Sequence, residues 1–194
     1  TISTPTRMNT PSQEQRTAKY TMVVFTISAV LSLLGLFLDM NGSYDASFTT
    51  LYIGIAVGFT PLGAFIVHRV PGNRIGKLMT AIGLCGALSL LSMSWGDWLP
   101  AAWVSQWCWW IPLALIPITL LIFPDGYLPT YRWRPFAIVM ISATALSTFA
   151  LAVAACYAPY TLLTNYANAI PEVATTALRI AAGGILVVIV GTIF

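Results

Sequence analysis

Apolar residues in this chain are gathered into six runs of about 20 residues, and short polar segments separate one run from the next. A helix rises about 1.5 Å per residue, so a run of this length matches the roughly 30 Å hydrocarbon core of a bilayer. The pattern therefore predicts an all-α, polytopic membrane protein with about six transmembrane helices. The predicted spans cover residues 20–38, 48–67, 75–94, 101–123, 136–157 and 173–194.

The composition agrees with a membrane protein and sets the domain organisation. Hydrophobic residues make up 58% of the 194 residues and charged residues only 8%, whereas soluble domains average roughly 45–50% and about 25%. Residues 1–19 are polar and predict a cytoplasmic tail, while residues 20–194 form the transmembrane domain and leave no room for a separate soluble domain. Because the last apolar run is uninterrupted at Phe194, we expect the domain to continue beyond it.

Charges alternate from gap to gap and predict the orientation. Eight of the nine Lys and Arg residues fall in three segments: 1–19, 68–77 and 124–135. The other three gaps hold four of the six acids and no Lys or Arg: 39–47, 95–100 and 158–172. Cytoplasmic loops collect Lys and Arg, so the N-terminus is predicted to be cytoplasmic in the cell membrane. Six spans would place the C-terminus on the same side, and the net charge of +3 reflects orientation rather than nucleic-acid binding.

Two features inside the spans bear on function. Pro112 and Pro117 fall in the fourth span, where they are expected to bend the helix and free backbone carbonyls. The central parts of the first five spans contain no Asp, Glu, Lys or Arg. Pumps and ion-coupled carriers normally keep such groups at membrane depth, so this absence argues against a transporter.

Tryptophan is concentrated near the predicted outer interface. Six tryptophans lie within 16 residues, and three of them share one helical face at spacings of i, i+4 and i+7: Trp103, Trp107 and Trp110. This face could form a wall for a lipid, a quinone or another apolar ligand. An interfacial aromatic belt is the favoured alternative, because indole prefers that depth of the bilayer.

Arg179 lies a short way into the sixth span, where charge is costly and often functional. It could contact an anion in an outward cavity. The favoured alternative is that the span begins near Ile180 and that the arginine side chain extends to the lipid headgroups.

Candidate redox and metal ligands are scarce. His68 is the only histidine and lies at the cytoplasmic edge, which excludes a haem held by two histidines. Cys85, Cys108 and Cys156 lack the spacing of metal ligands. Cys108 and Cys156 both fall near the outer side, where the geometry would allow a disulfide bond between them. No nucleophile–base set can be assembled, so no catalytic residue, metal or cofactor is predicted.

Two cytoplasmic turns carry a resemblance to a known family. The stretch HRVPGNRIGKL at 68–78 and the stretch LIFPDGYLPTYRWRP at 121–135 resemble turns in the N-terminal membrane regions of actinobacterial two-component sensor histidine kinases. Lys77 departs from the family, which often has Trp there, and the chain contains no phosphoacceptor or ATP-binding region. Either turn could serve insertion alone or relay a conformational change. Lipid headgroups are expected to contact Arg69, Arg74, Lys77, Arg132, Trp133 and Arg134.

The resemblance implies a membrane-embedded sensory or regulatory module, and the input region of a sensor kinase if a cytoplasmic domain follows. An alternative is a non-catalytic accessory subunit, because apolar faces with few polar groups suit lateral association. Its partners would be membrane lipids and either a second copy of the chain or a larger membrane complex. The small-molecule ligand, if any, is not identified by the sequence.

Overall fold

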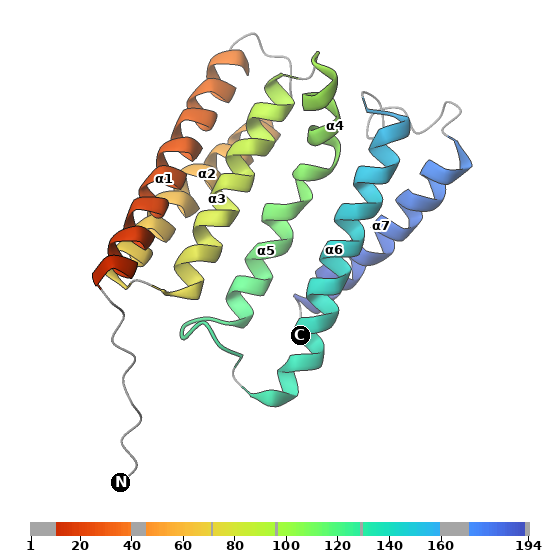
Figure 1. Cartoon of the computed structure of the whole chain (residues 1–194). Coiled ribbons are helices and arrows are strands. Elements are labelled where there is room, and N and C mark those ends of the chain that lie inside the picture. The colour runs from red at the N-terminus through yellow and green to blue at the C-terminus, as the bar shows by residue number, and fades with distance from the viewer. Residues whose placement is uncertain are drawn as a thin grey trace.

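The computed structural model describes residues 11–39, 46–70, 72–95, 97–128, 130–159 and 171–192, and these residues are helical apart from short turns (Figure 1). The prediction of an all-α fold is confirmed for this part of the chain. The helices are α1 (Pro11–Asp39), α2 (Ala46–Arg69), α3 (Arg74–Ser94), α4 (Leu99–Cys108), α5 (Trp110–Leu121), the 3₁₀ turn η1 (Tyr131–Trp133), α6 (Arg134–Tyr157) and α7 (Glu172–Gly191).

Five helical segments in the described residues are long and apolar enough to cross a membrane, which makes this a multi-pass membrane protein. They are Ser47–Arg69, Arg74–Ser94, Leu99–Leu121, Tyr131–Tyr157 and Glu172–Gly191. The first predicted span lies within α1, whose apolar part, Met22–Leu38, is shorter than the others. The count of six spans therefore stays a prediction.

The helices run up and down, so that alternate connections lie at opposite ends of the molecule (Figure 1). The start of α1, the α2–α3 turn, the α5–α6 connection and the end of α7 lie together at the lower end of the view. This end carries the Lys- and Arg-rich turns 68–77 and 124–135, and we call it the basic end. The topology thus groups the basic segments as the alternation of charge along the sequence predicted.

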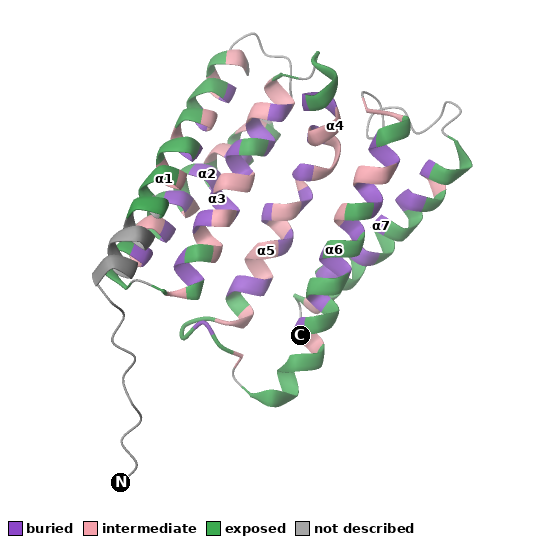
Figure 2. Ribbon diagram, viewed as in Figure 1, coloured by how far each residue is buried: buried purple, intermediate pink, exposed green. Residues whose placement is uncertain are grey.

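The helices form an open row rather than a closed bundle. Helices α1, α2 and α3 pack on one another, α3 contacts α4 and α5, and α6 joins that pair to α7. Helix α7 packs mainly on α6 and lies at one edge of the row (Figure 1). Buried residues form stripes on the faces where helices meet, and the remaining faces are exposed and suited to lipid (Figure 2).

Small residues bring the helices of the α2–α3 pair very close together. A Cβ added at Gly63 would lie 2.5 Å from the backbone nitrogen of Thr80, and one at Gly83 would overlap Thr60. In a bilayer the lipid is as apolar as the protein, so close van der Waals contact drives helix association. These glycines therefore fix the α2–α3 contact.

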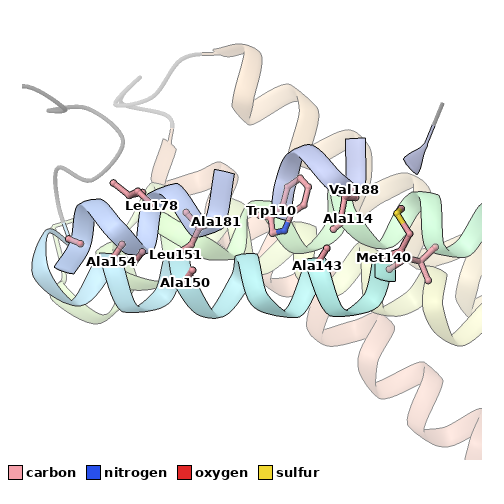
Figure 3. Close-up of a cluster of buried hydrophobic side chains, with 14 residues drawn as sticks. Trp110, Ala114, Met140, Ala143, Ala150, Leu151, Ala154, Leu178, Ala181 and Val188 are labelled. Atoms are coloured by element: carbon pink, nitrogen blue, oxygen red, sulfur yellow. The ribbon is translucent and has the colours of Figure 1, made fainter. Parts of the chain in front are cut away.

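The α6–α7 interface is built in the same way. Ala143 and Ser147 of α6 face Gly184 of α7 so closely that a Cβ on the glycine would meet both residues. Alanines from both helices continue this interface into the cluster drawn in Figure 3, which also receives Trp110 from α5. A narrow seam of small side chains therefore holds α7 in place.

The fourth predicted span is broken into two helices. Helix α4 ends at Cys108 and α5 begins at Trp110. Pro112 has no N–H to donate to the carbonyl of Cys108, four residues earlier, which explains an interruption here. Pro117 lies inside α5 without ending it. The sequence predicted bending at both prolines, whereas the structure has one break, which lies close to Pro112.

Candidate functional site

The first basic turn is shaped by local hydrogen bonds. After α2, the Val70 N–H donates to the Ile66 carbonyl at 2.8 Å, and Gly72 adopts φ +90°. Asn73 then caps α3, because its side-chain oxygen accepts the Gly76 N–H at 3.0 Å. The cap fixes the start of α3 and places Arg74 in its first turn.

The second basic turn follows α5 and is also closed by its own backbone. The Gly126 N–H donates to the Ile122 carbonyl at 2.8 Å, and Gly126 adopts φ +75°. Few residues other than glycine take this left-handed conformation at low cost. The chain then enters η1, and Pro135 occupies the first turn of α6, where its missing N–H costs nothing.

The two turns touch each other. The guanidinium carbon Cζ of Arg74 lies 4.7 Å from the centroid of the Tyr127 ring, a cation–π distance. A Cβ added at Gly126 would lie 3.2 Å from the Cβ of Arg74. Two segments some 50 residues apart in sequence, both part of the resemblance, thus form one contact between α3 and the α5–α6 connection.

The six residues predicted to contact lipid headgroups are all exposed at the basic end: Arg69, Arg74, Lys77, Arg132, Trp133 and Arg134. Two further arginines lie near aromatic rings, with Arg69 at 5.4 Å from Phe65 and Arg134 at 5.7 Å from Tyr131. The N-termini of α3 and α6 lie here together with the C-termini of α2, α5 and α7, so helix dipoles of both signs meet at this end. The exposed Lys and Arg side chains therefore give the basic end its attraction for anions.

The three tryptophans that share a face lie against the helix core rather than forming an open wall. Trp110 is only 4% exposed, and Trp103 and Trp107 pack against the same cluster of α6 and α7 residues. The Trp103 indole N–H donates to the Ala152 carbonyl of α6 at 3.1 Å. Trp95 and Trp98, in contrast, are exposed and in ring contact, as expected for an interfacial belt.

The α4–α5 break gathers polar atoms inside the protein. The Tyr52 hydroxyl of α2 donates to the Trp109 carbonyl at 3.1 Å, which ties the break to a neighbouring helix. Three buried side-chain atoms nearby have no hydrogen-bond partner within the described residues: the Gln106 amide oxygen and the indole nitrogens of Trp107 and Trp110. Sequence reasoning missed this cluster, although Pro112 beside the tryptophans was a signal for it.

Arg179 is exposed on α7, whose helical structure begins earlier, at Glu172. A groove of about 500 Å³ runs between α6 and α7 near Glu172 and Thr176, but Arg179 does not line it. The side chain is therefore placed on the outer surface of the helix, away from this groove.

The three cysteines are free. The Cys108 thiol is buried against α3, with its Sγ 4.0 Å from the Cys85 carbonyl, whereas Cys156 is exposed on α6. All three are free, so the thinkable Cys108–Cys156 bridge is not formed. Among the described residues, no group of His, Cys, Asp and Glu is arranged to hold a metal ion.

Comparison with protein-family models, with curated proteins and with solved structures finds no match for this chain. The resemblance of the two turns to actinobacterial sensor histidine kinases stays a prediction. Any assignment of function therefore depends on the geometry of the chain itself.

Proposed function

We propose that this chain is a membrane-embedded sensory or regulatory module that passes changes in helix packing to its basic end. The observation that carries the proposal is the contact between the two basic turns. Arg74 belongs to α3, and Tyr127 belongs to the connection that leads into α6. The contact joins α3, which packs with α1 and α2, to the connection that leads into α6, which packs with α7. We therefore expect a shift of α6 against α3 to change it.

The polar break between α4 and α5 is where we expect the packing to respond to a stimulus. The Tyr52–Trp109 hydrogen bond links α2 to the break, and the Trp103–Ala152 hydrogen bond links α4, on one side of the break, to α6. A ligand in the bilayer or at the outer face would change the module only if it binds two packing states unequally. A shift of α6 would carry α7 with it, since α7 packs mainly on α6.

The proposal includes an orientation and a location. Six spans in the cell membrane, with both ends of the chain on the cytoplasmic side, would place the basic end against anionic lipid. The grouping of 68–77 and 124–135 at one end supports this orientation. The signal would then leave through α7 on the cytoplasmic side, as in the input region of a sensor histidine kinase.

The gene itself offers the first test. A cytoplasmic histidine-kinase region encoded after Phe194 is the expected result. A stop codon soon after this position would contradict the sensor-kinase interpretation.

One observation favours a second function, that of a non-catalytic accessory subunit. Helix α7 lies at the edge of the row, packs mainly on α6 and exposes large apolar side chains, among them Leu186, Val187, Ile189 and Val190. Such a face suits lipid, and at the edge of the row it also suits a larger membrane complex. Native mass spectrometry after mild detergent extraction separates the two: a stable hetero-complex favours the accessory subunit, and a monomer or homodimer favours the sensory module.

A further inference from the structure

A groove at the basic end combines one cation with an apolar channel. It lies between α1, α2 and α3, has a volume of about 390 Å³, and is lined by Tyr20, Val24, Val67, Lys77, Thr80, Ala81 and Leu84. The Thr80 hydroxyl donates to the Gly76 carbonyl at 2.8 Å, so its hydrogen bond is satisfied within α3. This volume falls within the range of small-molecule sites, roughly 300–1,000 Å³. The groove is distinct from the contact between the two basic turns.

The lining residues are ordered by polarity along the helix axis. Lys77 lies in the first turn of α3, and Tyr20 of α1, which is 71% exposed, lines the same groove. Leu84 lies seven residues further along α3, about 10 Å deeper at the usual helical rise. The groove thus leads from a charged entrance into an apolar interior, which is the polarity of an amphiphile with an anionic head.

The charge at the entrance is available for such a head. Arg69, Arg74 and Arg134 each lie over an aromatic ring, whereas no ring contact of this kind is found for Lys77 within the described residues.

Two other grooves in the described part of the chain lack this combination. The groove between α6 and α7 has the carboxylate Glu172 among its lining residues. The groove between α1 and α2, beside Ser28 and Thr60, is lined by no charged residue. The groove between α1, α2 and α3 therefore differs from these two, because it has a cation, Lys77, beside apolar residues that suit an acyl chain.

We infer that this groove binds an anionic phospholipid, with the phosphate between Lys77 and Tyr20 and one acyl chain along Ala81 and Leu84. The inference goes beyond the sensory role and does not depend on it, because it requires only that the chain sits in a bilayer.

The test is native mass spectrometry of the full 194-residue chain in mild detergent, titrated with phosphatidylglycerol and, separately, with phosphatidylcholine. Lys77→Gln is expected to weaken phosphatidylglycerol binding about fivefold, the loss that follows removal of one cation near a membrane surface. Arg132→Gln is the matched control, because it removes the same charge at the same end from an exposed residue that does not line the groove. Circular dichroism checks that both variants remain helical.

A second variant tests the channel itself. Ala81→Phe fills the interior and is expected to weaken phosphatidylglycerol binding while leaving Lys77 in place. The inference is overturned if Lys77→Gln and Arg132→Gln weaken binding equally, since the attraction would then belong to the whole surface. It is also overturned if phosphatidylcholine binds as tightly as phosphatidylglycerol, or if glycerol 3-phosphate, which has no acyl chain, competes as well as the lipid.

Discussion

At the scale of single residues, Gly126 and Arg74 hold the two basic turns together. Gly126 is buried, adopts a positive φ of 75°, and a Cβ there would lie 3.2 Å from the Cβ of Arg74, which is a tight contact. The Arg74 guanidinium then reaches the Tyr127 ring. Sequence reasoning found both turns from their basic residues and from the resemblance. It could not bring them together, because nothing local in either segment specifies a partner 50 residues away.

Gly126→Ala tests the backbone part of this contact. We expect the variant to lose about 1–2 kcal/mol of stability, because a side chain in the left-handed region is strained and the new Cβ crowds Arg74. Thermal unfolding in detergent, followed by circular dichroism, measures the effect. Gly58→Ala in α2 is the control, since a Cβ there meets nothing within 4 Å and alanine favours a helix. Equal stability of Gly126→Ala and the parent chain would show that the turn is not constrained as described.

A double-mutant cycle tests the side-chain part. Arg74→Gln and Tyr127→Leu should show a coupling free energy of about 0.5–1 kcal/mol, the usual size for an exposed cation–π pair. The measurement is the unfolding midpoint of both single variants and the double variant. Arg132→Gln combined with Tyr127→Leu is the comparison and should show additive effects. Coupling of the same size in both cycles would mean that Arg74 has no special relation to the ring.

At the scale of helices, close packing of small residues decides which elements meet. Helix α7 depends on one seam, in which Gly184 lies against Ala143 and Ser147 of α6. The lengths and order of the helices follow from the apolar runs, and the break near Trp109 follows from the chemistry of Pro112. The seam could not be predicted, because glycines at 183 and 184 look alike in the sequence and only the packing tells which one faces α6.

The neighbouring glycines provide a matched pair of variants. Gly184→Ile should destabilise the protein by about 1–3 kcal/mol, because a bulky side chain must force α6 and α7 apart. Gly183→Ile places the same residue one position away, where a Cβ meets nothing within 4 Å, and should cost far less. The helix propensity of the two changes is similar, so the difference between their unfolding midpoints reports packing alone. A Gly183→Ile variant as unstable as Gly184→Ile would place the seam elsewhere.

At the scale of the whole molecule, the up-and-down topology turns an alternation along the sequence into a separation in space. The turns 68–77 and 124–135 come together at one end because successive helices run in opposite directions, counting α4 and α5 together. Sequence reasoning anticipated this grouping from the positive-inside rule. It assigned the tryptophans 103, 107 and 110 to an interface or a ligand wall. The structure buries Trp110 and packs the partly buried Trp103 and Trp107 against the same cluster, a neighbour that the periodic face could not reveal.

The central claim is that the basic end faces the cytoplasm while apolar helices cross the membrane between the two ends. Thiol labelling tests it most directly in a variant whose three native cysteines are replaced by serine. His68→Cys and Asp125→Cys at the basic end should react with an impermeant maleimide only after the cells are permeabilised. Asp97→Cys, between α3 and α4, should react in intact cells. Labelling of positions 68 and 125 from outside intact cells, with position 97 protected, would contradict the orientation and the signalling direction proposed from it.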